Sequence, residues 1–471
     1  MRKGHGMVNG RWVLVIVICL IASDTIFGGS PVSMSQEEDI SEILAHPTDT
    51  SVTISLHSEQ ELVAYYRYGF EPSKLSSQTE TVICPAGKTA PIVLDKLQSD
   101  TRYYYRLYSR TAGDDNFEQG EVRTLHTQRA KGKVFTFAIQ ADSHLDENTS
   151  EPLYRQNLNN IAAGKPDFLI DLGDTFMTDK HRPYQTAHKQ YLAQRVLLGK
   201  LCNSIPLFLV LGNHDGESGR WLDGTDDNMT VWSAGLRKQL FPNPAPDSFY
   251  SGNIAIEKFI GPPENYYAWE WGDALYIVLD PYRYTVQRSR RDRDNWSRTL
   301  GKTQYDWLKE TLESSNSAHK FIFIHNLVGG LDRSMRGGAE AASLFEWGGR
   351  NLHGDVEFYE RRAGWELPIH QLLVRNGVSA VFHGHDHFFA KQDMDGIVYQ
   401  LVPQPGHPGG RTVRNADEYG YRAGDMVPGS GHLRVTVTPN MCTVDFIRAI
   451  LPQKDHAGMS NGDIAYTYLI D

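Results

Sequence analysis

Five apolar runs in the second part of the chain each end in residues that commonly ligate metal ions, and this feature restricts the fold most. The runs alternate with segments that have the spacing of amphipathic helices. Their endings, in chain order, are Asp142-Ser143-His144, Gly173-Asp174, Gly212-Asn213-His214-Asp215, His325 and Gly384-His385-Asp386-His387. Buried strands that alternate with helices form an α/β fold, and the carboxyl ends of such strands meet at one edge of a sheet. We therefore expect these residues to gather in one site.

Further apolar segments in this part of the chain predict antiparallel strands. One hairpin-like stretch covers residues 266–280, and a pair of strands is expected near residues 433–450. Together with the alternating strands and helices, they indicate an α/β/β/α sandwich of two mixed sheets. We expect this catalytic domain to span residues 133–450 and to be followed by a C-terminal tail, residues 451–471.

The first part of the chain has a different pattern, which predicts a small all-β domain over residues 37–128. Val52, Ile54 and Leu56 alternate with polar residues, and clusters of Pro, Gly, Ser and Asp separate such runs. Residues 97, 99, 101 and 103 are Leu, Ser, Thr and Tyr, which is the alternate-residue pattern of a tyrosine corner. In this respect the segment resembles fibronectin type III sandwiches. We expect its tyrosines to serve packing.

The N-terminus has the features of a secretory signal peptide, which we place at residues 1–30. Arg2, Lys3 and Arg11 come before an apolar run over residues 12–22. That run is shorter than the roughly 20 apolar residues that span a bilayer. The expected location is therefore secreted, periplasmic or cell-envelope, with no stable membrane span after cleavage; an uncleaved N-terminal anchor is the alternative.

Charge and cysteine content narrow the function classes. The formal net charge of −10 argues against a general nucleic-acid-binding protein, which usually presents a basic face. Cys84, Cys202 and Cys442 are widely separated and form no CxxC pair, so a cysteine-based zinc site is excluded. They are either free buried thiols or one disulfide with a leftover thiol. The sequence does not indicate the oligomeric state.

The five strand endings together resemble the calcineurin-like metallophosphoesterase superfamily, whose motifs are D-x-H, GD, GNH[DE], a lone H and GHxH in this order. The β-sandwich in front of them resembles the domain order of purple acid phosphatases. The resemblance implies two divalent metal ions (Mn, Fe, Zn or mixed), for which carboxylate, imidazole and amide ligands are suited. The implied ligands are Asp142, His144, Asp174 and His387 for the first ion, and Asp174, Asn213, His325 and His385 for the second, with Asp174 as the bridge.

The resemblance also implies the chemistry, which is attack of a metal-bound hydroxide on a small phosphorylated substrate. Phosphomonoesters are the expected substrates; phosphodiesters and a catalytically silent binding scaffold are the alternatives. His214 is expected to donate a proton to the leaving group. Asp215 is expected to fix the tautomer of His214, or alternatively to cap the loop without a catalytic part.

One position departs from the purple enzymes, and the long loops leave several roles open. Purple acid phosphatases carry a tyrosine three residues after the GD aspartate, where this chain has Met177, and usually glycine where it has His144. A purple Fe(III) centre is therefore not expected. Arginines in the loops, among them Arg220, Arg237, Arg333, Arg336, Arg350 and Arg361, either clamp phosphate or are solvated. His407 either reaches the metal site or is a turn residue.

Overall fold

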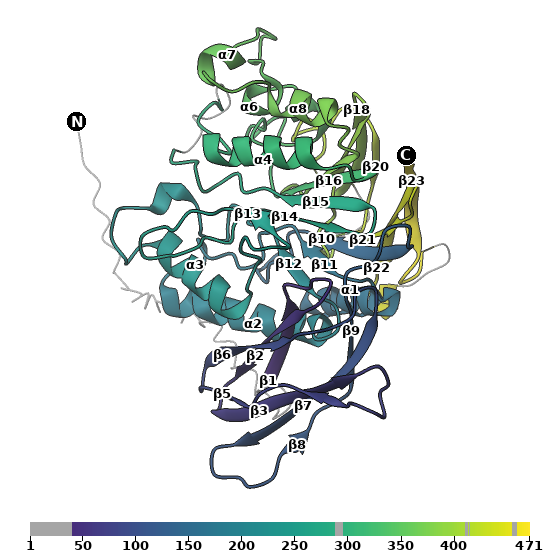
Figure 1. Ribbon diagram of the computed structural model, residues 1–471. Coiled ribbons are helices and arrows are strands. Elements are labelled where there is room, and N and C mark those ends of the chain that lie inside the picture. The colour runs from purple at the N-terminus through teal and green to yellow at the C-terminus, as the bar shows by residue number, and fades with distance from the viewer. Residues whose placement is uncertain (1–39, 288–294, 410–412, 414, 455–458) are drawn as a thin grey trace, which may run out of the picture.

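The computed structural model describes residues 40–287, 295–409, 413, 415–454 and 459–471 (Figure 1). The predicted export segment, residues 1–30, lies outside these ranges. Within them, the helices are too short or too polar to cross a membrane.

The first region is a sandwich of two antiparallel sheets. The smaller sheet contains β1 (Ile40–Ala45), β2 (Val52–Ser58) and β6 (Lys88–Leu94). The larger contains β3 (Leu62–Gly69), β4 (Ser77–Gln78), β5 (Val82–Cys84), β7 (Arg102–Thr111), β8 (Glu118–Gln119) and β9 (Arg123–His126). Val52, Ile54 and Leu56 from one sheet pack with Tyr66 and Tyr105 from the other, as the alternation predicted.

The tyrosine corner is present. The backbone N–H of Gln98 donates a hydrogen bond to the hydroxyl oxygen of Tyr103 at 2.8 Å. Leu97 and Tyr103 are both buried in the sandwich core. The bond fixes the loop before β7 and supports the predicted fibronectin-like sandwich.

The second region is built on two mixed sheets. The first has the strand order β12 (Leu207–Leu209), β11 (Leu169–Asp171), β10 (Phe135–Gln140), β21 (Ser430–Val437), β22 (Cys442–Ala449), β23 (Ile464–Ile470). The second has the order β13 (Ser251–Gly252), β14 (Tyr267–Trp271), β15 (Ala274–Val278), β16 (His319–Ile324), β17 (Ala380–His383), β19 (Ile397–Leu401), β18 (Phe389–Met394), β20 (Asp425–Val427). Strands β10 to β12 run parallel, as do β15, β16, β17 and β19.

Helices cover the outer faces of both sheets (Figure 1). The first sheet is covered by α1 (Glu151–Gly164), α2 (Tyr184–Cys202) and α3 (Met229–Leu240). The second is covered by α4 (Lys302–Ser314), α5 (Gly338–Ala342), α6 (Phe345–Gly348), α7 (Phe358–Arg361) and α8 (Ile369–Arg375). The short 3-10 helices are η2 (Gly219–Trp221) and η3 (Pro452–Lys454). Phe137, Trp269 and Phe323 belong to the core between the sheets, so the predicted α/β/β/α order is confirmed.

The end of the chain corrects one predicted boundary. Residues 451–471 were expected to form a tail, but β23 pairs antiparallel with β22, and Val444 lies opposite Tyr468. The strand is rich in β-branched and aromatic residues, which suit a partly buried sheet position. Its last residue, Ile470, is buried in the core between the sheets. Residues 464–470 therefore belong to the first of the two mixed sheets.

The two regions are joined through a buried arginine. Arg195 of α2 donates from Nε to the Ser41 hydroxyl at 2.9 Å and from Nη2 to the Ser55 carbonyl at 2.5 Å. It also donates to the carbonyl of Leu240. A buried guanidinium needs such partners because its desolvation is otherwise costly. The sandwich is therefore held against the catalytic region by directed hydrogen bonds as well as by packing.

The three cysteines of the described residues are free. Cys84 is buried in the sandwich, Cys202 at the end of α2 and Cys442 in the core between the two mixed sheets. The free-thiol alternative is thus the one that the structure contains.

Candidate metal centre

The five motifs follow five strands that end at the same edge of the molecule. Three of the strands, β10, β11 and β12, belong to the first sheet, and the parallel registers place their ends together. The other two, β16 and β17, belong to the second sheet. The motifs therefore meet across the seam between the two sheets, as the sequence predicted for strand ends.

Tight backbone turns bring the motifs close to one another. Asp142, Asp174, His385 and His387 have positive φ values of 56°, 53°, 80° and 68°. Such conformations are uncommon for residues other than glycine and concentrate at functional sites. Gly212 makes the closest approach: a Cβ there would lie 2.1 Å from the backbone nitrogen of Asp174. The glycine of the GNHD motif is therefore required for its loop to pack on the GD loop.

His325 lies at the centre with its Nε2 atom among oxygens. Its Nδ1 is 2.8 Å from the carbonyl oxygen of Leu172, which assigns the proton of a neutral ring to Nδ1. Its Nε2 is 3.2 Å from the Asp174 carboxylate and 3.2 Å from the amide oxygen of Asn213. In a neutral ring this places a lone pair against two oxygens. A cation between these atoms would convert the repulsion into coordination.

Asp142 has one carboxylate oxygen that suits a metal ligand. Its Oδ2 accepts a hydrogen bond from the backbone N–H of His385 at 2.9 Å. Its Oδ1 is fully buried, lies 3.2 Å from Nε2 of His387 and makes no aligned hydrogen bond to any described residue. Buried carboxylate oxygens are normally satisfied by hydrogen bonds or by a metal ion.

The remaining predicted ligands surround these atoms. Donor atoms of Asp174, His325 and His385 all lie within 4.8 Å of one another. The ring of His144 is 5.2 Å from that of His387, and its Nδ1 is 3.2 Å from the Asp146 carboxylate. His144, Asp174, His385 and His387 line a cavity of about 140 Å³. Carboxylate, imidazole and amide groups fit divalent Mn, Fe or Zn, so the donor set suits the implied ions.

The carboxylates and imidazoles at the centre shift one another's pKa values. Burial raises the pKa of Asp174, but the imidazoles of His325, His214 and His385 lower it well below its usual range. Burial opposes protonation of His325, yet the Asp174 and Asp142 carboxylates raise its pKa to about 10. The carboxylates therefore remain ionised in a buried setting, where positive charge from protonated His325 or from a bound cation stabilises them.

His214 has a different partner from the one predicted. Its Nδ1 lies 2.7 Å from the carboxylate of Asp179, and its backbone N–H donates to Asp174 at 2.8 Å. Its side chain lines the cavity. Asp179 was missed because nothing in the spacing of the GD loop marks it; only the path of residues 175–183 brings it to the imidazole.

Asp215 caps the loops instead of contacting the His214 ring. Its carboxylate accepts backbone N–H bonds from Gly212 at 2.7 Å, Asp174 at 3.0 Å, and both Thr175 and Phe176 at 2.9 Å. Four backbone donors surround it because the GD and GNHD loops both turn toward it. The expectation that Asp215 orients His214 is therefore corrected, and the loop-cap alternative describes the geometry.

The structure places the loop arginines in different surroundings. Arg237 is buried against Glu217, with Nε 2.6 Å from the carboxylate, and Arg220 stacks on Trp221 at 4.6 Å. Arg336 lines the metal cavity together with Lys180 and Met177. Met177 thus faces the site at the position where the purple enzymes have tyrosine.

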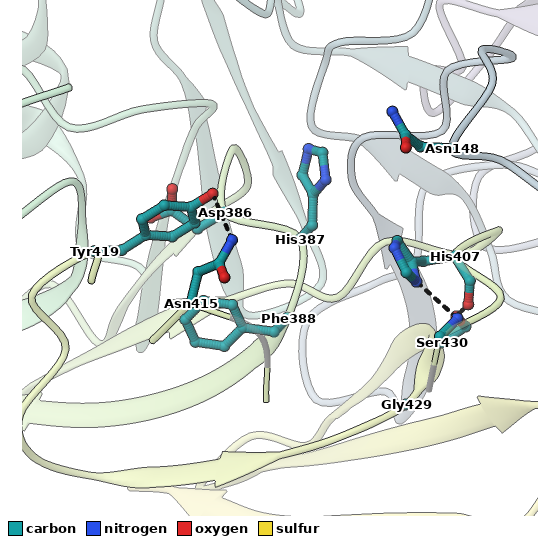
Figure 2. A pocket seen from close by; sticks show the side chains of 10 residues that line it. Asn148, Asp386, His387, Phe388, His407, Asn415, Tyr419, Gly429 and Ser430 are labelled. Atoms are coloured by element: carbon teal, nitrogen blue, oxygen red, sulfur yellow. Dashed lines mark hydrogen bonds between the residues drawn. The ribbon is translucent and has the colours of Figure 1, made fainter. Parts of the chain in front are cut away.

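A second pocket of about 180 Å³ adjoins the cavity (Figure 2). The two share Asn148, Asp386, His387 and Tyr419 as walls. Figure 2 shows Tyr419 and Asn415 on one side of the pocket and His407 and Ser430 on the other. His407 therefore lies in a wall next to His387, and its Nδ1 accepts a bond from the Gly409 N–H at 2.9 Å.

Known proteins resemble this chain in sequence motif and in fold. A family model described as calcineurin-like phosphoesterase matches residues 135–389. The solved structure of PhoD has a TM-score of 0.65 and 15% identity, over 91% of this chain and 89% of that chain. The purple acid phosphatase PPD1 from yellow lupin (Lupinus luteus) seeds has a TM-score of 0.57 and 14% identity, over 91% and 73%. At these identities the likeness concerns the fold alone. No curated protein sequence matches the chain.

Proposed function

The chain belongs to the calcineurin-like phosphoesterase family, whose model matches more than half of it, and we propose that it hydrolyses phosphomonoesters at a pair of divalent metal ions. Family membership makes the chain a metal-dependent phosphoesterase that acts on a phosphorylated substrate, in agreement with the predicted resemblance. The number of ions and the preference for monoesters are the proposed part.

The observation that carries the proposal is the arrangement of oxygens around His325 and His387. Nε2 of His325 faces Asp174 and Asn213, each at 3.2 Å, whereas Oδ1 of Asp142 lies 3.2 Å from Nε2 of His387. At each place an imidazole nitrogen and carboxylate or amide oxygens converge, which are the donor types that a divalent cation takes as ligands. Oδ2 of Asp174 faces His325 and its Oδ1 accepts the backbone N–H of His214, and a carboxylate with two oxygens at this edge supports two ion positions with a shared ligand.

When bound, two divalent ions would supply a hydroxide nucleophile near neutral pH and offset negative charge on the phosphoryl group. The chain provides the proton for the leaving group. Asp179 holds Nδ1 of His214 at 2.7 Å, which directs Nε2 away from that contact. Burial opposes protonation, but Asp174 and Asp179 raise the pKa of His214. The raised pKa favours the protonated imidazole, which is suited to donate its proton to the departing alkoxide.

Two further features concern the choice of ester. Lys180 and Arg336 line the cavity, and two cations favour a dianionic monoester group. The adjoining pocket of about 180 Å³ favours the second candidate, a phosphodiester, because it has room for another substituent. A silent scaffold is not favoured, since every predicted ligand and His214 are present in the chain.

Export is proposed on the sequence of residues 1–30 alone. The basic start and the short apolar run support a mature enzyme that acts outside the cytoplasm. Sequencing the N-terminus of protein recovered from the medium and from the cell envelope would distinguish cleavage from an uncleaved anchor.

The function is tested by metal analysis combined with kinetics on two substrates. We expect two metal ions per chain, loss of activity with a chelator, and recovery with Mn, Fe or Zn. We also expect a higher kcat/KM for an aryl phosphomonoester than for the diester with the same leaving group. One ion per chain in the fully active enzyme would refute the dinuclear centre, and a preference for the diester would refute the substrate assignment.

A further inference from the structure

Arg336 is the most firmly held cation in the wall of the metal cavity. It lies between β16 and α5, and its backbone N–H donates to the carbonyl oxygen of Tyr419 at 2.9 Å. Its side chain is 18% exposed, whereas that of Lys180 is 41% exposed. The contact of Lys180 with Asp146 is 3.3 Å long. Arg336 is therefore the more buried of the two.

Three contacts fix the guanidinium of Arg336. Its Nε lies 2.6 Å from the Asp386 carboxylate, and Nη2 donates to the His385 carbonyl oxygen at 3.3 Å. The guanidinium carbon lies 4.1 Å from the centre of the Tyr419 ring. None of these contacts uses the Nη1 amino group. A guanidinium that is contacted along one edge and on one face keeps its orientation when no substrate is bound. Little side-chain entropy is therefore lost when substrate binds.

The residues that hold Arg336 are themselves held. The Asp386 side chain is 1% exposed, and the Tyr421 hydroxyl donates to its second oxygen at 2.7 Å. Asp386 and Tyr419 are neighbours in the shared wall of the two pockets (Figure 2). The next residue, Gly337, has no room for a side chain, because a Cβ would lie 2.5 Å from the Tyr421 hydroxyl. Asp386 therefore supports the guanidinium directly, and Tyr421 in turn holds Asp386.

We propose that Arg336 binds a non-ester oxygen of the phosphoryl group and makes the enzyme selective for phosphomonoesters over phosphodiesters. This inference rests on the proposed function. A bound monoester has three non-ester oxygens and two negative charges above its second pKa of about 6, whereas a diester has two such oxygens and one charge. A fixed guanidinium can donate to the third oxygen, since arginine forms directed, charge-assisted hydrogen bonds with phosphate.

The position of Arg336 beside the GHDH loop fits this role. Its contacts are with the backbone of His385 and the side chain of Asp386, and Asp386 is not a predicted metal ligand. The guanidinium thus reaches the cavity from the side of the ligand histidines without taking a ligand position. It is in place to contact an oxygen of a phosphoryl group that His385 and His387 also surround.

The test compares Arg336→Gln and Arg336→Lys with Arg333→Gln, an exposed arginine of the same loop, as the matched control. Each variant is assayed on an aryl phosphomonoester and on the diester with the same leaving group. For Arg336→Gln we expect kcat/KM on the monoester to fall about 10- to 100-fold, as for the loss of a hydrogen bond to a charged group. The diester should change far less, and inhibition by inorganic phosphate should weaken in parallel with the monoester.

Arg336→Lys keeps the charge and loses the planar fork, so it separates recognition from a folding defect. We expect an intermediate, monoester-selective loss with metal content and melting temperature unchanged. Equal losses on both esters, loss of metal from both variants, or no loss at all would overturn the inference. Wild-type enzyme without activity on either ester would instead refute the proposed function, which keeps the two failures distinguishable.

Discussion

The N-terminal sandwich and the metal edge of the catalytic region differ in how they treat buried polar groups. In the sandwich the Tyr66 hydroxyl donates to Glu42 at 2.8 Å, and the Tyr103 hydroxyl accepts from Gln98. At the metal edge Oδ1 of Asp142 makes no aligned hydrogen bond to a described residue, and His325 faces oxygens with Nε2. These tyrosines are satisfied by protein groups, whereas the metal edge needs positive charge from elsewhere.

The strongest test of this difference is Asp174→Asn. An amide carries no charge and is a poor bridge between two cations, so both ion positions should weaken together. We expect metal content to fall and kcat/KM to drop by at least about 10⁴-fold, the scale seen when an essential catalytic group is removed. Near-normal metal content and turnover would show that the edge does not depend on this carboxylate.

His214→Ala should affect turnover and leave the metals in place. Its imidazole contacts Asp179, so removal takes away a proton donor and not a proposed ligand. We expect kcat to fall by roughly 10²- to 10⁴-fold, and by less for an ester with a very acidic leaving group. His325→Ala is the matched variant and should lose metal and impair both esters alike. A metal-depleted His214→Ala enzyme would place this residue among the ligands.

Substitutions of the two aspartates near His214 should have different effects, one on turnover and the other on stability. Asp179→Asn should lower kcat by about 10- to 100-fold, as for residues that orient a catalytic histidine, with little change in stability. Asp215→Asn should instead destabilise the fold by about 1–3 kcal/mol, because an amide cannot serve the same backbone donors. Turnover and urea unfolding measured on both variants check this. The opposite pattern would restore Asp215 as the partner of His214.

Arg195→Met tests the joint on the sandwich side and should have the smallest effect on activity. The change leaves the oxygens of Ser41, Ser55 and Leu240 without their donor, and we expect a loss of about 2–4 kcal/mol in the free energy of unfolding. Turnover should stay within about twofold, since no part of the metal edge is touched. Arg102→Met, at an exposed position of β7, is the control. A large fall in kcat would show that the joint positions the active site.

The sequence predicted that the five strand ends meet at one edge, because local order decides this. Each candidate ligand comes directly after a buried strand, and parallel strands bring their ends together whatever the loops do between them. Alternation in residues 52–56 likewise predicted the sandwich core. The pairing of Asp179 with His214 and the four N–H bonds to Asp215 depend instead on loop paths. No periodicity records such paths, and adjacency in sequence favoured the wrong aspartate.

The same limit applies to the loop arginines and to the end of the chain. Arg237 and Arg336 look alike in sequence, yet one is buried against Glu217 and the other lines the cavity. Only the fold decides which of them meets a carboxylate away from the site. Residues 464–470 have strand character, but a sheet edge must be available for them to join, and the sequence does not show that edge.

The position of the metal centre between the two mixed sheets also bears on the stability of the folded domain. Asp142, Asp174 and Asn213 follow strands of the first sheet, whereas His325, His385 and His387 follow strands of the second. Ions held by both groups would fasten one half of the domain to the other, and ligands that bind only the folded state stabilise it by a free energy that grows with the logarithm of their free concentration. The lifetime of the folded enzyme would then follow the metal supply of its surroundings, so that scarcity of metal removes the protein as well as its activity.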